Sequence, residues 1–258
     1  MYKFGLKLWS TNTDYYLAAA RRLYSQGIFD YIELYVVPDT LSALLHWKTL
    51  PIPYIIHCPH FAHKFNLADP AKRAYNTKIY QEVKAYADTL NARYIIFHGG
   101  VEHNIEETAK QLANLHDTRA LIENKPYRAP LGEKEQCRGY SIEEISYVMQ
   151  EVGCGLCLDI GHAICAANSL GKEPYSYLES FVALAPKMFH ISGNDISSPV
   201  DRHLHINEGN YDYQRILSLM RHGEYISIET KKDSPHSLDD FAEDVADLKT
   251  QVSKENAL

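Results

Sequence analysis

The 258-residue sequence predicts an α/β protein in which eight strand–helix units close into a single (β/α)8 barrel, a TIM barrel. Strand-like segments alternate with amphipathic helical segments from end to end. Tyr54-Ile55-Ile56 and Tyr94-Ile95-Ile96-Phe97 are apolar on both faces, as parallel strands covered by helices require. Eight such units in about 250 residues are typical of the closed barrel.

A doubly wound open sheet is the alternative arrangement of alternating strands and helices. Its first turn usually carries glycines, and Trp9-Ser10-Thr11-Asn12-Thr13-Asp14 contains none. No internal repeat, low-complexity segment or linker divides the chain. Residues 1–258 are therefore expected to form one domain.

Eight runs rich in β-branched and aromatic residues are interpreted as strands. The gaps between them leave room for a helix, which favours parallel pairing. In chain order the predicted strands are Phe4–Ser10, Tyr31–Val37, Tyr54–His60, Tyr94–Gly99, Ala120–Lys125, Gly155–Ile160, Met188–Ser192 and Tyr225–Thr230.

The intervening segments are interpreted as helices. Tyr75, Ile79 and Val83 keep helical spacing in the longest of them. Ser141 and Glu144 have the spacing of a capping box, which predicts a helix start. The predicted helical segments are Tyr15–Gln26, Thr40–Leu50, Pro70–Leu90, Ile105–Leu115, the segment from Ser141, Tyr175–Leu184, Tyr213–Arg221 and Ser237–Gln251.

The composition is that of an ordinary globular protein, with 45% hydrophobic and 23% charged residues. A net charge of −7 argues against a surface that coats DNA generally, although a local basic patch remains compatible with it. The first residues contain no apolar run typical of a signal peptide, and no segment reaches the length of a membrane helix. We expect a cytoplasmic protein without membrane contact.

The five cysteines do not indicate a disulfide framework, because their number is odd and the chain is long. Cys154-Gly155-Leu156-Cys157 resembles half of a zinc or redox motif. No second cysteine pair completes it, so these cysteines are interpreted as small apolar residues of a buried strand.

Side chains that can bind metal follow six consecutive predicted strands. Each alone is more often a hydrogen-bonded or solvated loop residue. In a barrel, however, the carboxyl ends of the strands meet on one face, where sites form. The set comprises His57, His98, Glu123, Asp159, His162, His190, Asp201, His203 and Glu229.

A group of buried carboxylates is costly unless cations neutralise it. Five histidines and four carboxylates without cysteine suit Zn²⁺, Mn²⁺ or Fe²⁺ better than Ca²⁺. Nine ligands exceed the needs of one ion. With one bridging carboxylate they suffice for two or three.

Several of these residues lie in motifs that resemble those of the endonuclease IV family (AP endonuclease family 2), within the larger group of xylose-isomerase-like barrels. The resemblance runs from the third predicted strand onward. It rests on His57, His98-Gly99-Gly100, Ile122-Glu123-Asn124, Leu158-Asp159-Ile160-Gly161-His162, Phe189-His190, Val200-Asp201-Arg202-His203, Glu208-Gly209-Asn210 and Ile228-Glu229-Thr230.

The resemblance implies three metal ions, with zinc as the first expectation. The first ion would be held by His57, His98 and Glu123. The second would share Glu123 and be held also by Asp159, His190 and Glu229. The third would be held by His162, Asp201 and His203. In that family the ions bind a phosphodiester and activate the attacking hydroxide.

The chain departs from that family where DNA is recognised. Enzymes of that family carry a long loop after the second strand that enters the minor groove. Here Tyr35-Val36-Val37-Pro38-Asp39-Thr40 is short and lacks Arg and Lys. His60 and Phe61 replace the expected aromatic wedge, and Asn207 stands where the family usually has Gly. The expected substrate is thus abasic-site DNA or a smaller phosphate ester.

Basic side chains in the predicted top-face loops favour an anionic substrate, although ordinary solvated loop charges would look the same. The fifth-strand loop carries Lys125, Arg128, Lys134 and Arg138 against Glu133 and Glu135. The predicted substrate-binding residues are Lys125, Arg128, Arg202 and Lys231.

Three functions remain open on the sequence. The first is a metal-dependent phosphoester hydrolase of endonuclease IV type, with Glu123 and Glu229 as catalytic residues. The second is a sugar or sugar-phosphate isomerase or epimerase, since relatives of that kind resemble the chain at Glu123, Asp159, His190 and Glu229 and need one ion. The third is a metal-binding barrel without catalysis. The additional histidines favour the first.

Overall fold

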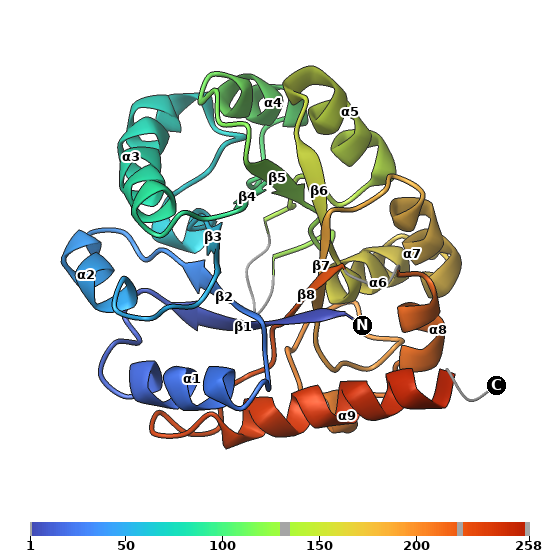
Figure 1. The fold of residues 1–258 in the computed structure, drawn as a ribbon. Helices are drawn as coiled ribbons and strands as arrows, with labels where there is room; N and C mark the ends of the chain where they lie inside the picture. The colour runs from blue at the N-terminus through green and yellow to red at the C-terminus, as the bar shows by residue number, and fades with distance from the viewer. Residues whose placement is uncertain (1, 130–134, 221–223, 256–258) are drawn as a thin grey trace.

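The strands of the computed structural model close into one barrel in the order β1 to β8 (Figure 1). Residues 2–129, 135–220 and 224–255 are described. Every neighbouring pair is parallel, and β8 pairs with β1. The predicted fold class is confirmed. The strands are β1 (Lys3–Trp9), β2 (Tyr31–Tyr35), β3 (Tyr54–His57), β4 (Ile95–His98), β5 (Ala120–Glu123), β6 (Gly155–Asp159), β7 (Met188–Ile191) and β8 (Tyr225–Ile228).

The helices surround this barrel (Figure 1). In the described ranges, none is long and apolar enough to cross a bilayer. The α-helices are α1 (Tyr16–Ser25), α2 (Leu44–Trp47), α3 (Arg73–Thr89), α4 (Ile105–Ala113), α5 (Ile142–Val152), α6 (Ile160–Ser169), α7 (Pro174–Val182), α8 (Tyr213–Ser218) and α9 (Asp239–Glu255). Four 3₁₀ turns accompany them: η1 (Leu41–Ala43), η2 (Phe61–His63), η3 (Pro70–Lys72) and η4 (Ile206–Glu208).

Most predicted helices are present, with three differences. Helix α6 follows β6 directly and was not predicted; the helix expected there is α7. The segment 40–50 is only η1 followed by the short α2. Helix α9 continues to Glu255, four residues beyond the predicted end at Gln251. Ser141 caps α5 as expected, since its hydroxyl accepts the N–H of Glu144 at 3.3 Å.

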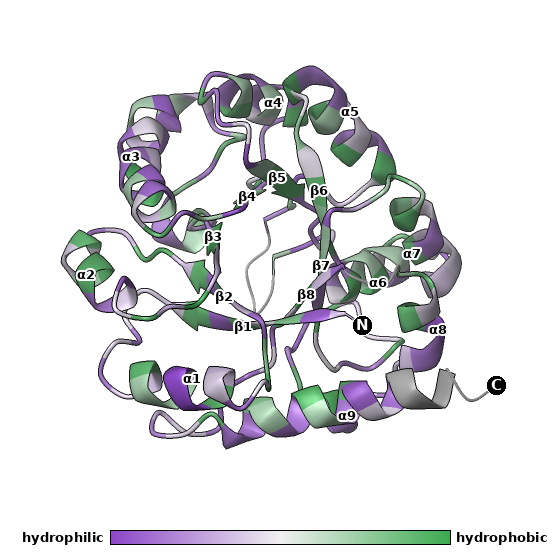
Figure 2. Ribbon diagram, viewed as in Figure 1, coloured by the Kyte–Doolittle hydropathy of each residue, from purple (hydrophilic) through white to green (hydrophobic). Residues whose placement is uncertain are grey.

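The two faces of each strand have different roles. Phe4, Leu6 and Leu8 of β1 point away from the barrel axis and belong to the main apolar core with the helices. In Figure 2 the strands are mostly hydrophobic, whereas the helices carry both hydrophobic and hydrophilic residues. Residues of the opposite parity point into the barrel.

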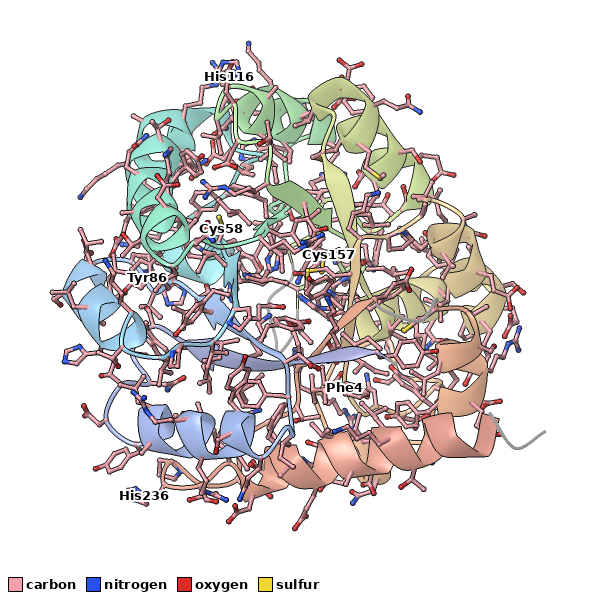
Figure 3. All side chains as sticks on the ribbon, in the orientation of Figure 1. Phe4, Cys58, Tyr86, His116, Cys157 and His236 are labelled. Atoms are coloured by element: carbon pink, nitrogen blue, oxygen red, sulfur yellow. The ribbon has the colours of Figure 1, made fainter. Side chains whose placement is uncertain are left out.

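Near the amino-terminal ends of the strands, the barrel interior is filled by closely packed apolar side chains. They are those of Tyr31, Ile55, Ile96, Leu121, Cys157 and Met188. A Cβ on Gly5 would lie 2.3 Å from the Tyr31 ring, so only glycine leaves room for that ring. Figure 3 shows Cys157 inside the ring of strands. Cys154 and Cys157 form no disulfide. Towards the carboxyl-terminal ends of the strands, the inward side chains become polar.

Candidate metal centre

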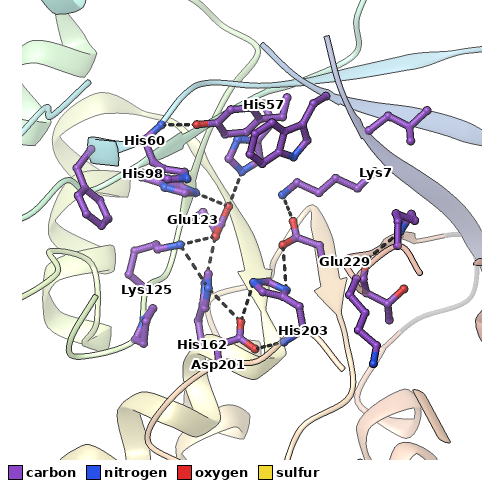
Figure 4. A pocket seen from close by; sticks show the side chains of 18 of the residues that line it. Lys7, His57, His60, His98, Glu123, Lys125, His162, Asp201, His203 and Glu229 are labelled. Atoms are coloured by element: carbon purple, nitrogen blue, oxygen red, sulfur yellow. Dashed lines mark hydrogen bonds and ion pairs between the residues drawn. The ribbon is translucent and has the colours of Figure 1, made fainter. Parts of the chain in front are cut away.

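The nine predicted metal ligands lie together at the carboxyl-terminal end of the barrel, next to a cavity of about 480 Å³, and Figure 4 labels the seven that line this cavity. Seven of them line the cavity: His57, His98, Glu123, His162, Asp201, His203 and Glu229. Asp159 and His190 are buried, and both contact this group. Parallel strands bring their carboxyl ends together, so residues distant in the chain meet here.

Glu123, at the end of β5, is the central carboxylate. Its Oε2 lies 3.0 Å from Nε2 of both His57 and His98. Its Oε1 lies 3.1 Å from His162 Nδ1 and 3.3 Å from Lys125 Nζ. Both oxygens of one buried carboxylate therefore face different partners, which is the arrangement expected of a bridging ligand.

His190, on β7, joins Glu123 to a second pair of carboxylates. Its Nδ1 lies 2.8 Å from Glu229 Oε1. The same nitrogen is 3.7 Å from both Asp159 Oδ2 and Glu123 Oε2. His190 is fully buried, so this group is held away from solvent.

The third group comes from α6 and the loop that follows β7. His162 Nε2 and His203 Nε2 lie 3.4 and 3.3 Å from Asp201 Oδ2. A two-way backbone pair between Gly193 and Leu204 holds the loop against β7. His203 has a positive φ of 48°, an unfavourable conformation that the loop contacts must sustain.

Three imidazoles each bind a protein acceptor through one nitrogen and face a carboxylate with the other. The outer nitrogens are His57 Nδ1, 2.7 Å from the Cys58 carbonyl oxygen, and His162 Nδ1, 2.9 Å from that of Asn124. The third is His190 Nε2, 2.9 Å from Glu33 Oε2. In a neutral imidazole these acceptors take the only N–H. The other nitrogen of each ring faces a carboxylate oxygen. Burial would lower the pKa of His190, but Cys157, Glu229 and Glu33 outweigh it and raise that pKa well above its usual value, so a proton occupies this place in the metal-free protein and a metal ion would replace it.

Buried polar atoms without hydrogen-bond partners support the same conclusion. They include His190 Nδ1, Asp201 Oδ2 and His203 Nδ1, whose nearest charged groups, at 2.8 to 3.9 Å, are ion-pair contacts without hydrogen-bond geometry. Such orphaned atoms are rare in folded proteins and call for a specific explanation. A set of imidazole nitrogens and carboxylate oxygens fits Zn²⁺, Mn²⁺ or Fe²⁺.

The protonation of the first group suits metal binding. Burial would raise the pKa of Glu123, but His98 and Lys125 outweigh it and hold that pKa well below its usual value. Burial lowers the pKa of His98 well below its usual value, although Glu123 opposes this. A charged carboxylate therefore faces a neutral imidazole, and these are the forms that bind metal.

Sequence reasoning missed two charged residues beside the cluster, the partly buried Lys7, which lines the cavity, and the fully buried Glu33. Lys7 Nζ contacts Glu229 and lies 3.2 Å from Glu33 Oε1 (Figure 4). Ser227 donates a hydrogen bond to Glu33 Oε2. A signal was present, because each charge stands between apolar neighbours in a strand, in Leu6-Lys7-Leu8 and Ile32-Glu33-Leu34. The predicted ligands were confined to the strand ends.

The predicted substrate-binding residues have different positions. Lys125 lines the cavity, with Nζ 3.3 Å from His162 Nε2 (Figure 4). Lys231 lies at the cavity edge and pairs with Glu208 at 3.0 Å. Arg128 and Arg202 are exposed and do not line the cavity. Lys134 and Glu133, which contributed to the predicted charge of this loop, lie outside the described residues.

Residues 19–251 match the model of a protein family, the xylose isomerase-like TIM barrel. The chain belongs to this family. The match covers most of the sequence and agrees with the closed barrel. Members include isomerases, epimerases and endonucleases, so membership alone leaves the reaction open.

Individual xylose isomerase-like proteins resemble the chain at low identity. A probable endonuclease 4 of Mycoplasmoides gallisepticum is 24% identical over 186 residues, 66% of this chain; the chain spans about three fifths of that relative's length, 61%. A D-tagatose 3-epimerase-like protein superimposes with a TM-score of 0.73 at 18% identity, covering 99% and 98% of the two chains. Endonuclease IV from Thermus thermophilus gives 0.68 at 18%, covering 98% and 99%. These structures show the shared fold.

Proposed function

We propose that the chain is a metal-dependent phosphoester hydrolase of endonuclease IV type that holds two or three divalent ions, Zn²⁺ first and Mn²⁺ or Fe²⁺ as alternatives. The observation that carries the proposal is the set of imidazoles whose outer nitrogens are bound by protein acceptors and whose inner nitrogens face carboxylates. The three ligand groups are His57, His98 and Glu123; Glu123, Asp159, His190 and Glu229; and His162, Asp201 and His203.

The bound ions would supply a hydroxide at neutral pH and neutralise charge on a phosphate. Glu123 would join the first two groups, since its Oε2 lies 3.0 Å from His57 Nε2 and 3.7 Å from His190 Nδ1. Glu229 would be held in place by Lys7 and His190. Lys125, beside Glu123 in the cavity, would contact a phosphate oxygen of the substrate. Burial of these groups strengthens each electrostatic contact.

We propose a small phosphate ester as the substrate in preference to duplex DNA containing an abasic site. After β2 only residues 36–40 precede η1, so no long loop extends from this position. Arg128 and Arg202 lie outside the cavity lining. The cavity of about 480 Å³ has the size of a small-molecule site.

Metal analysis and hydrolysis assays test the proposal together. The purified protein should contain two or more divalent ions per chain and should hydrolyse phosphoesters, with an abasic duplex and small esters compared side by side. Glu123→Gln should reduce kcat/KM at least ~1,000-fold and should lower the metal content, whereas the exposed control Glu151→Gln should leave both unchanged. Fewer than two ions, or no hydrolysis by the fully loaded protein, would remove the proposal.

A sugar or sugar-phosphate isomerase or epimerase is the second candidate. It is favoured by two carboxylates, Glu123 and Glu229, that flank the same nitrogen of His190 and line one cavity. Such a pair can move a proton to and from a carbon beside a carbonyl. This function predicts one essential ion and solvent deuterium in the sugar, lost in Glu123→Gln and Glu229→Gln. Deuterium incorporation without phosphate release would replace the hydrolase by this candidate.

A further inference from the structure

One wall of the cavity is made of aromatic rings. We call Trp9, Tyr35, His60 and Phe61 the aromatic wall; all four line the cavity. The ring centroids of Trp9 and Tyr35 are 5.2 Å apart, and those of Tyr35 and His60 are 5.5 Å apart. The rings come from the ends of β1 and β2 and from the segment after β3, so three neighbouring strands build this surface.

Trp9 is unusually exposed for its size. Its exposed fraction is 47%, and of the large hydrophobic residues that are exposed in the described ranges it alone lines the cavity. Its indole N–H has no hydrogen-bond partner within the described part of the chain. An exposed indole contributes little to folding, and a buried tryptophan usually finds a partner for that N–H. Trp9 therefore offers a ligand both a flat face and a hydrogen-bond donor.

The wall is fixed before any ligand arrives. Asn12 Oδ1 accepts the backbone N–H of Trp9 at 2.7 Å, and the Trp9 carbonyl accepts that of Asn12 at 2.8 Å. The Tyr35 hydroxyl accepts the backbone N–H of His60 at 3.0 Å. The His60 ring lies nearly parallel to that of His98, at 10°. A rigid aromatic surface loses little conformational entropy when it binds a ring.

The aromatic wall lies next to the proposed metal ligands. From Trp9 the step to Tyr35 is 5.2 Å, and the next step, from Tyr35 to His57, is 5.3 Å between ring centroids. Cationic side chains, Lys125 and Lys232, line other parts of the same cavity. A ligand that spans the cavity thus meets apolar, flat surface at one end and imidazoles and ammonium groups at the other.

We propose that the aromatic wall binds the ring of the substrate by stacking on Trp9, and that the substrate is the phosphate ester of a ring compound, either a nucleotide or a cyclic sugar phosphate. This inference rests on the proposed hydrolase function for the placement of the phosphate. A nucleobase stacked on an aromatic face typically gains a measurable share of its affinity from that contact. The indole N–H would donate to a ring nitrogen or hydroxyl.

Equilibrium binding tests the wall separately from catalysis. Adenosine 5′-monophosphate, ribose 5-phosphate and inorganic phosphate are titrated by calorimetry into the metal-loaded and chelator-treated protein. We expect adenosine monophosphate, or both esters, to bind at least ~10-fold more tightly than inorganic phosphate. Tight binding of the nucleotide alone would assign a nucleobase to the wall, and tight binding of both would assign the sugar ring. Equal affinity for all three would overturn the inference.

Variants of Trp9 test whether the ring of the substrate stacks on this residue. Trp9→Leu should lower the affinity for the ester at least ~10-fold and leave the affinity for inorganic phosphate unchanged. Trp9→Phe should largely retain the affinity for the ester. The matched control is Tyr15→Ala, because Tyr15 is 56% exposed, packs on His236 and does not line the cavity. Wild-type ester affinity in Trp9→Leu, with normal metal content and Tm, would overturn the inference.

Tryptophan fluorescence gives a second readout, since the chain contains only Trp9 and Trp47. Trp47 is fully buried and donates its indole N–H to the Ser10 carbonyl at 2.9 Å. Saturable quenching by the ester should therefore disappear in Trp9→Phe. Ester binding without hydrolysis would leave the wall intact and remove the hydrolase proposal. Hydrolysis that does not depend on Trp9 would support the hydrolase proposal and remove the proposed role of the aromatic wall.

Discussion

At the scale of single residues, the most informative groups are the two charges that point into the barrel, Lys7 and Glu33. Burial alone would raise the pKa of Glu33, but His190 and Lys7 outweigh it and lower that pKa to about 2. Burial would lower the pKa of Lys7, yet Glu229 and Glu33 raise it above its usual value. A carboxylate behind a metal-binding histidine orients the ring and strengthens the ligand.

Glu33→Gln should weaken metal binding without changing any proposed ligand. The neutral amide is a poorer acceptor for His190 Nε2, so Nδ1 becomes a weaker ligand. We expect zinc affinity, measured by competition with a chromogenic chelator, to fall about 10–100-fold. Glu151→Gln is the remote control of equal charge change. An unchanged zinc affinity in Glu33→Gln would contradict the role of Glu33.

Lys7→Met should have opposite effects on the metal-free and metal-loaded protein. Removal of the ammonium leaves Glu33 and Glu229 with excess negative charge, which destabilises the metal-free fold. In this variant, bound cations would neutralise more unbalanced negative charge than in the wild type, so they would stabilise the fold more. We expect a lower Tm after chelation and a larger rise of Tm on addition of zinc, measured by scanning calorimetry. An equal or smaller rise would count against this coupling.

At the scale of elements, α6 connects the proposed metal centre to the fold. Asp159 caps this helix, since its Oδ1 accepts the N–H of His162 at 2.7 Å. Its Oδ2 faces His190 Nδ1 and His162 Nδ1. One carboxylate thus serves the helix and the metal centre with different oxygens.

Asparagine at position 159 should separate these two roles. Asn is a good cap, so Asp159→Asn should keep most of the stability of the metal-free protein but lose most of the stabilisation by zinc. Asp159→Ala should lose the cap as well, about 1 kcal/mol. Asn104→Ala, which removes the cap of α4 far from the metal centre, should cost a similar amount and leave zinc binding intact. Chemical denaturation with and without zinc measures each contribution.

Helix α6 also shows why some elements escape prediction from sequence. Residues 160–167 are all buried, so the segment has no polar face and no helical periodicity of apolar residues. Helices with such periodicity, α3 and α4, were predicted to within a few residues. The 40–50 segment, predicted as one helix, forms only η1 and the four-residue α2.

At the scale of the whole molecule, the barrel explains how far the site was predictable. The nine predicted ligands could be assigned to one site because parallel strands bring their carboxyl ends to one face. Lys7, Glu33 and the aromatic wall were missed because their positions depend on the register between neighbouring strands. This register places Lys7 beside Glu33 and Tyr35 beside His57. That register follows from barrel closure. Because β1 pairs with β8 and the family match spans residues 19–251, we also propose one domain over 1–258.

Acid should weaken the fold through Asp117, between α4 and β5. Burial would raise the pKa of Asp117, but hydrogen bonds from Arg119 and Tyr80 lower it to about 2. A lowered folded-state pKa stabilises the protein above about pH 4, and this stabilisation is lost as the pH falls towards about 2. Asp117→Asn should therefore cost roughly 1–2 kcal/mol at about pH 7 and much less near pH 2. A cost that does not change with pH in urea unfolding would contradict this assignment.

The contact between Lys7 and Glu229 joins the first strand of the barrel to the last. During synthesis on the ribosome, Lys7 and its partner Glu33 emerge early, whereas Glu229 is translated near the end. The complete set of proposed ligands therefore exists only after Glu229 has left the ribosome, so loading of the proposed ions would follow translation of the last strand.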